Sequence, residues 1–145
     1  MKKNLSILLV FIGFSCGFAK VTNNEKNAIV GTWEFVSAKI NGKNDARSET
    51  LNRTQHFFAD QSFEGRFIAN DGEPQLYNNG KYFMANDTTL VTIQNDLSGK
   101  LSSFSNVFTV KISNDTMHLY GFFIRPVNPT TIIPVFLEEY WVKKR

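Results

Sequence analysis

Apolar and polar residues alternate along most of this chain with a period of two, which is the spacing of β-strands that bury one face. In residues 103–113, Phe104, Phe108 and Val110 share one parity, and Lys111 has the other. Runs of this kind recur about every ten residues, separated by segments rich in Asn, Asp and Gly. We therefore expect eight strands, at residues 30–40, 53–59, 62–69, 80–85, 88–94, 103–113, 116–125 and 133–143.

The connections between these runs indicate how the strands are joined. Asp60-Gln61, Asn86-Asp87 and Asn114-Asp115 have the composition of two-residue hairpin turns, since Asn and Asp tolerate a left-handed backbone. Two connections are longer, at residues 41–52 and 126–131. Because closure removes exposed sheet edges, the series of hairpins predicts an all-β fold: a single eight-stranded antiparallel up-and-down barrel.

The first residues have the pattern of a secretory signal peptide. A short basic head is followed by a run of about ten apolar residues, and small residues precede a cleavage site after Ala19. This run is too short for a transmembrane helix, which needs about 20 apolar residues. We expect a signal peptide at 1–19, a flexible lead-in at 20–28 and one barrel domain at 29–145, exported to the periplasm or cell envelope.

Cys16 leaves the fate of the leader open. Cleavage after Ala19 removes this cysteine, the only one in the chain, and the exported protein then has no disulfide or thiol chemistry. Cleavage just before Cys16 would instead give a lipoprotein anchored by its acylated thiol, although the preceding residues match that pattern poorly. Free export is the preferred interpretation, and a lipid anchor is the alternative.

The charge of the chain gives no reason to expect a nucleic-acid partner. The whole sequence has 16 Lys and Arg against 13 Asp and Glu, a formal net charge of +3. Lys2 and Lys3 leave with the leader, so the exported part is close to neutral. A nearly neutral domain has no electrostatic attraction for DNA, RNA or an anionic membrane surface.

No sequence pattern points to catalysis, and we expect a protein that is not an enzyme, without metal or cofactor. His56 and His118 are the only histidines, and neither has a second ligand at metal-binding spacing. No Gly-x-Ser-x-Gly motif marks a nucleophile. Glu138 and Glu139 are adjacent, so in a strand they face opposite sides and cannot act as a pair.

Short motifs at both ends of the chain resemble a known family. Gly31-Thr32-Trp33 and the segment of residues 139–144 resemble the two ends of bacterial lipocalin-like (calycin-type) domains of uncharacterised function. The hairpin at residues 57–63 and Gly80-Lys81-Tyr82 resemble the middle strands of that family. The resemblance implies an exported barrel, but it implies no reaction and no agreed ligand.

Within such a barrel, a binding site needs an apolar cavity with a few placed polar groups. The aromatic side chains on strand faces either pack the core or line this cavity. Asn106 and Arg125 either orient a ligand, with the arginine meeting a ligand anion, or lie at the solvent face or rim; Arg66 has the same two options. The candidate ligand-binding residues are Trp33, Phe35, Phe57, Phe67, Tyr82, Asn106, Phe108, Arg125 and Tyr140.

Two hypotheses about function follow. The first is an exported barrel that binds a small, largely apolar molecule in its interior. The alternative is a non-catalytic envelope module whose filled barrel contacts a protein or glycan through exposed aromatics such as Phe122 or Tyr77. The last strand favours an outer contact, because both of its faces carry bulky apolar residues. The oligomeric state is not indicated by the sequence.

Overall fold

The computed structural model describes residues 28–45, 52–68, 72–96, 99–128 and 131–145. No helix in these segments is long and apolar enough to cross a membrane. The eight expected strands are present, and a two-residue strand follows the first of them. The strands are β1 (Gly31–Ile40), β2 (Lys43–Asn44), β3 (Asn52–Phe57), β4 (Ser62–Ile68), β5 (Gln75–Asn86), β6 (Thr89–Asn95), β7 (Leu101–Ser113), β8 (Thr116–Asn128) and β9 (Thr131–Lys143).

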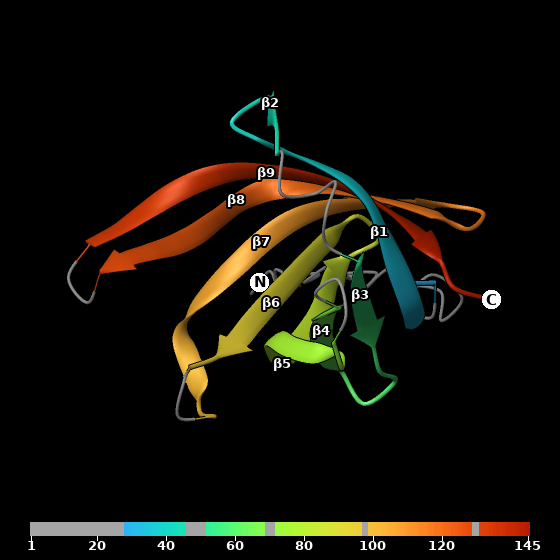
Figure 1. Ribbon diagram of the computed structural model, residues 1–145, viewed down its shortest axis with the longest axis horizontal. Coiled ribbons are helices and arrows are strands. Elements are labelled where there is room, and N and C mark those ends of the chain that lie inside the picture. The colour runs from blue at the N-terminus through green and yellow to red at the C-terminus, as the bar shows by residue number, and fades with distance from the viewer. Residues whose placement is uncertain (1–27, 46–51, 69–71, 97–98, 129–130) are drawn as a thin grey trace, which may run out of the picture.

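The sheet closes on itself because β1 pairs with a strand on each side (Figure 1). Trp33 lies opposite Gln55 of β3 and also opposite Lys143 of β9. After Glu34 the pairing with β3 ends, and the short β2 pairs with the end of β1 instead. The predicted fold class is confirmed: the chain forms a closed eight-stranded antiparallel barrel with one additional strand.

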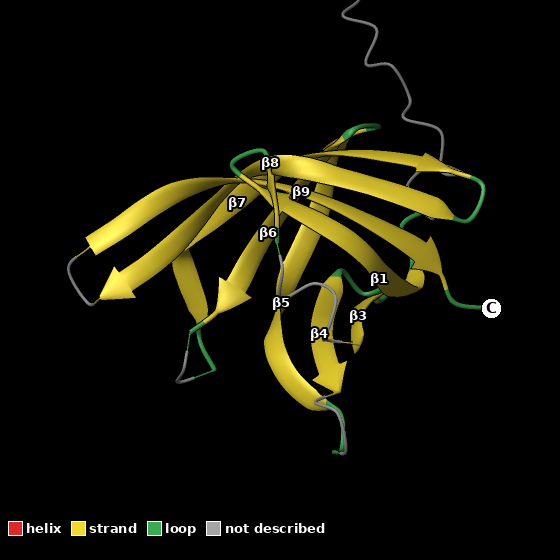
Figure 2. Cartoon of the chain, turned by 45° about the horizontal axis from the view of Figure 1, so that its top comes forward, coloured by secondary structure: helices red, strands yellow, loops and turns green. Residues whose placement is uncertain are grey.

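The barrel has a long wall and a shorter one. Figures 1 and 2 show β7, β8 and β9 curving together over one side, with β3, β4 and β5 opposite them. The ends of β8 and β9 next to residues 129–130 project past the other strands in both views. The interior between these walls is therefore bounded by strands that are distant in the sequence.

The prediction of a long connection at residues 126–131 is wrong, because β8 and β9 extend into this segment. A proline lacks an amide donor and is tolerated in a strand only where no partner needs one. The pairing of β7 with β8 ends at Phe122, and the next amide on that side, that of Ile124, donates to Asn106 Oδ1 at 3.0 Å. Pro126 follows on the same side, where β7 requires no donor.

Strand β5 begins at Gln75 and not at residue 80, because its polar first half pairs with β4 although it shows no alternation. The predicted signal peptide at 1–19 and the lead-in up to residue 27 lie outside the described residues. The hairpin turns occur near the expected places, with Gln61 and Asn114 at φ values of 65° and 55°.

The core lies on the inner faces of the strands. Trp33, Leu90, Met117 and Trp141 are almost completely buried and belong to one cluster. The indole Nε1–H of Trp33 donates to the carbonyl oxygen of Ile29 at 2.8 Å, so the aromatic ring also satisfies a buried backbone group. Trp33 thereby fixes the chain just before the strand that closes the barrel.

We expect the substitution Trp33→Phe to lower the free energy of unfolding by about 2 kcal/mol, because it leaves the Ile29 carbonyl unsatisfied and creates a cavity. Chemical denaturation checks this value. Val36→Ala on the exposed side of the same strand is the control and should change stability by under about 0.5 kcal/mol. Equal effects of the two substitutions would contradict the role assigned to Trp33.

Candidate ligand-binding cavity

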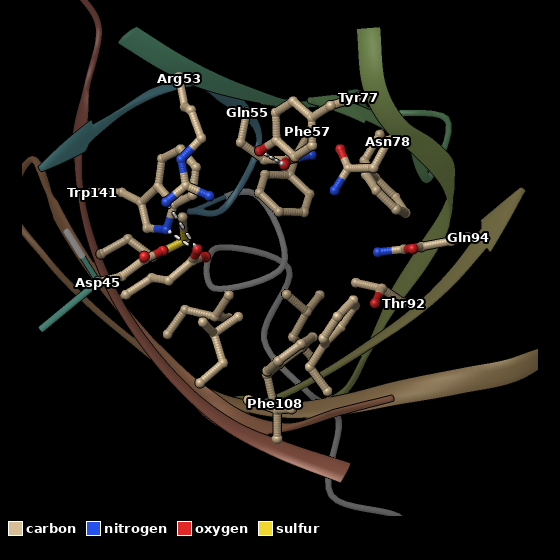
Figure 3. A pocket seen from close by; sticks show the side chains of 18 of the residues that line it. Asp45, Arg53, Gln55, Phe57, Tyr77, Asn78, Thr92, Gln94, Phe108 and Trp141 are labelled. Atoms are coloured by element: carbon tan, nitrogen blue, oxygen red, sulfur yellow. Dashed lines mark hydrogen bonds and ion pairs between the residues drawn. The ribbon is translucent and has the colours of Figure 1, made fainter. Parts of the chain in front are cut away.

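The barrel contains a partly open cavity of about 370 Å³ to which all eight of its strands contribute side chains (Figure 3). Alternation along each strand explains this, because every second residue points inward. In Figure 3, Phe108 lies on one side of the space, opposite Arg53 and Gln55. The apolar side chains that line the cavity are Ile40, Phe57, Phe63, Leu90, Phe108, Met117, Leu119, Phe123, Val135, Leu137 and Trp141.

One polar group on the cavity wall is an ion pair. Arg53 Nη2 lies 3.3 Å from Glu139 Oε1, and both side chains are largely buried. The guanidinium carbon of Arg53 sits 3.6 Å from the centre of the Phe35 ring and 5.7 Å from that of Trp141. The indole N–H of Trp141 donates to Glu139 Oε2 at 3.2 Å. The cation is therefore held by a carboxylate and by two aromatic faces.

Burial raises the pKa of the Glu139 carboxyl above the ordinary value for Glu, because the charged form loses its hydration. The Arg53 guanidinium and the hydrogen bond from Trp141 oppose this rise, and the charge of Asp45 adds to it. Asp45 also lines the cavity. This wall thus holds one guanidinium and two carboxyl groups.

A second polar group consists of uncharged side chains. Tyr77 donates from its hydroxyl to Gln55 Oε1 at 3.4 Å, and Asn78 lies beside them (Figure 3). Although 37% of the Tyr77 surface remains exposed, the hydroxyl end points inward. Burial there raises the pKa of the Tyr77 phenol, and the charge of Glu139 adds to the rise. The phenol is therefore a neutral hydrogen-bonding group at ordinary pH.

Five of the nine candidate residues predicted from the sequence lie at the cavity or in the packing around it. Phe57 and Phe108 line the cavity. Trp33 and Tyr82 are buried in the core cluster, where the Tyr82 hydroxyl donates to the carbonyl of Phe58 at 2.8 Å. Phe35 supports Arg53, as described above.

The other candidates lie at the margins of the cavity or away from it. The ring of Phe67 is 6.3 Å from that of Tyr77. Asn106 is buried, and its oxygen serves the backbone of β8. Tyr140 is on the outer face of β9, where its ring stacks on His118 at 4.3 Å and its hydroxyl donates to Glu138. The side chain of Arg125 lies outside the described residues.

Arg66 takes the second of its two options, the solvent face. It is exposed and pairs with Glu64 on its own strand at 2.9 Å. Arg53 occupies the interior instead. The sequence contains an indication of this inward position, because Arg53 and Gln55 have the same parity in β3 as the apolar Phe57. Nothing in the sequence indicated that Glu139 would lie within reach of Arg53.

Within the described segments, no three His, Cys, Asp or Glu side chains are grouped so that they could hold a metal ion. The polar groups of the cavity are suited to hydrogen bonding, and its larger apolar part is suited to burial of hydrocarbon.

We expect the carboxyl of Glu139 to titrate with a midpoint above 4.5, the ordinary value for Glu. Because the folded protein binds this proton more tightly than the unfolded chain does, the protonated carboxyl stabilises the fold. This stabilisation should be complete below the unfolded-state pKa and lost as pH rises through the raised folded-state pKa. Arg53→Met should raise the midpoint further and, at pH values where Glu139 is ionised, destabilise the protein by roughly 3–5 kcal/mol. Carbon-detected NMR titration and denaturation measure both quantities.

The matched control is Arg66→Met, which removes an arginine from an exposed pair. It should leave the Glu139 midpoint unchanged and affect stability far less, because solvent screens that pair. A Glu139 midpoint that is insensitive to Arg53→Met would contradict the proposed coupling.

The comparisons with known proteins are consistent with the fold. No curated protein matches the chain. Among solved structures, As-p18, an extracellular fatty acid binding protein, is similar with a TM-score of 0.45 at 8% identity, over 81% of this chain and 97% of that chain. The model of the lipocalin-like domain family matches residues 29–119. Because this match covers more than half of the sequence, the protein belongs to the lipocalin-like domain family.

Proposed function

We propose that the protein binds a small, largely apolar molecule inside its barrel. The observation that carries this proposal is the cavity of about 370 Å³, which lies within the usual size of ligand sites. A barrel of eight short strands can be filled completely by its own side chains, and this one retains space among aromatic and aliphatic groups. Removing apolar ligand surface from water would supply the binding energy, at about 25 cal/mol per Å².

Binding of this kind needs no covalent step. The apolar side chains Leu90, Met117 and Leu119 would bury the body of the ligand. The polar side chains of the opposite wall would fix its orientation. As-p18 is described as an extracellular fatty acid binding protein, and a ligand with an aliphatic body is compatible with the cavity described here.

We further propose that the protein acts in the periplasm or cell envelope. This rests on the sequence of residues 1–19, with its basic head, apolar run and small residues before the cleavage site. Anchoring through an acylated Cys16 is the alternative mode of attachment. Native mass spectrometry of the protein from its own host distinguishes the two, because the mass shows whether the chain begins at Lys20 or at a lipidated Cys16.

The substitution Val135→Phe should test the interior as the binding site. Val135 lines the cavity from β9, so a larger ring there would occupy the space of the ligand. We expect at least about a tenfold loss of affinity for Nile red, a neutral apolar dye, since tenfold corresponds to only about 1.4 kcal/mol. Fluorescence titration measures this affinity.

The control is the same substitution on the outer face of the same strand. Val142 is 38% exposed, and Val142→Phe should leave the dye affinity unchanged. Unchanged affinity in Val135→Phe, or equal losses in both variants, would show that the dye does not bind in the barrel.

A row of apolar side chains on the outside of the barrel supports a second candidate function, a contact surface of the envelope module. Successive cross-strand pairs join Phe83, Val91, Val107, Phe122 and Phe136 across β5 to β9. Phe122 is 62% exposed and meets Phe136 edge-to-face at 5.4 Å. Tyr77, expected in such a patch, instead has its hydroxyl end at the cavity.

If this outer row joins two copies of the chain, sedimentation velocity should show a dimer whose fraction increases with protein concentration. Phe122→Ser should then shift the protein to monomer, because it removes the most exposed ring of the row. Phe58→Ser, at an exposed phenylalanine outside the row, is the control. A monomer at all concentrations would rule out this role in self-association.

A further inference from the structure

Two buried polar atoms at the cavity have no hydrogen-bond partner among the described residues. They are the amide nitrogen Nε2 of Gln55 and the amide oxygen Oδ1 of Asn78. Gln55 is only 7% exposed, and both residues line the cavity. An unpaired buried donor or acceptor costs free energy, so a native protein usually provides a partner for it.

A glycine between these two residues creates the polar wall on which they lie. Gln55 of β3 pairs with Gly65 of β4, and Gly65 pairs with Asn78 of β5. A β-carbon at position 65 would overlap Asn78 Oδ1 and the end of the Tyr77 ring. The missing side chain of Gly65 therefore lets the amide of Asn78 and the hydroxyl of Tyr77 fold over the strand towards Gln55.

Among the described residues that line the cavity, only Arg53 carries a guanidinium, and this group already has partners. Arg53 pairs with Glu139 at 3.3 Å and covers the Phe35 ring at 3.6 Å. A ligand carboxylate would have to displace Glu139 and would enter a wall that also holds Asp45. A ligand ammonium would have to displace Arg53 from the aromatic faces that hold it.

We propose that the ligand carries an uncharged head group that both donates and accepts hydrogen bonds, such as a hydroxyl or a primary carboxamide, and that this group binds between Gln55 and Asn78. The proposal rests on the function proposed above and specifies the class of ligand. Both atoms are shielded from water in the described arrangement, so the two amide side chains would turn towards the head group. The head group then accepts from Gln55 Nε2 and donates to Asn78 Oδ1. A hydroxyl satisfies either orientation of the Asn78 amide, because it offers both a proton and lone pairs.

Selectivity follows from the cost of leaving groups unpaired. A site built to hydrogen-bond an uncharged group rejects an analogue that cannot make the same bonds, since its own buried polar atoms remain unsatisfied. An ionised carboxylate accepts but does not donate, so it leaves Asn78 Oδ1 without a partner. An ammonium donates but does not accept, so it leaves Gln55 Nε2 without one.

Four ligands with the same chain and different heads test the proposal: decan-1-ol, decanamide, decanoate and decylammonium. Their affinities are measured by displacement of Nile red from the purified protein at neutral pH. We expect the alcohol and the amide to bind at least about tenfold more tightly than either ion. This is the effect of at least one additional hydrogen bond between uncharged groups. This comparison uses the unmodified chain, so it does not depend on how any variant folds.

Two variants locate the head group. Gln55→Met removes the unpaired donor, so it should lower the affinity for decan-1-ol by about tenfold. The affinity for decylammonium, which cannot accept from that donor, should stay nearly unchanged. Thr92→Val, which alters another polar residue of the cavity wall, is the matched control and should preserve the ranking of the four ligands. Circular dichroism and thermal unfolding establish that both variants are folded.

A third variant tests the role of the ion pair. Glu139→Gln keeps the shape of the side chain but frees Arg53 from its carboxylate. We expect decanoate to gain at least about tenfold in affinity in this variant, while decan-1-ol changes little.

The outcomes separate this inference from the proposed function. If all four ligands bind equally, or decanoate or decylammonium binds best, the cavity binds apolar chains but the inference about the head group is wrong. An unchanged affinity of Gln55→Met for decan-1-ol overturns it as well. If neither Nile red nor any of the four ligands binds, the proposed function itself fails and the inference with it.

Discussion

The pairing of β1 on both of its sides is the constraint on which the rest of this structure depends. At Trp33 and Glu34 the same short stretch is in register with β3 and with β9, so the first and last parts of the chain become neighbours. Without this contact the sheet would have two exposed edges and no enclosed interior. The buried ring of Trp33, bonded to the carbonyl of Ile29, holds the chain at the point where the two ladders meet.

Closure places apolar and polar side chains around one interior. The inner faces of β6 to β8 contribute apolar side chains such as Leu90, Phe108 and Leu119, and β6 adds the polar Thr92 and Gln94. The inner faces of β3, β5 and β9 contribute Arg53, Asn78 and Glu139 beside apolar residues. Buried polar groups of this number are tolerated only where they are paired or meet a ligand. The ion pair satisfies the charged groups, and the unpaired amides of the other group are the part of the wall that a ligand would complete.

The candidate site could be predicted from the sequence only where a residue's own strand determined its surroundings. Phe57 and Phe108 follow a regular alternation, and both line the cavity. Tyr140 could not be assigned in this way, because both faces of β9 carry bulky side chains; its ring lies outside, stacked on His118. The inward position of Gln55 was missed because polar side chains in a strand ordinarily face solvent. Tyr77 and Asn78 precede residue 80, where the sequence predicts the strand to begin. Their inward position results from the glycine at position 65 and an irregularity in the pairing of β4 with β5.

The sequence by itself determined the class of fold, the family likeness and nearly all of the strands, because alternation and turn composition are local properties of the chain. Tertiary structure decided which strands meet at the closure, that β8 continues through Pro126 while paired with β9, and that Arg53 and Glu139 form a buried pair. It also decided that the barrel is not filled. These features depend on contacts between residues far apart in the sequence, and the volume left inside a closed sheet depends on how all of its side chains pack together.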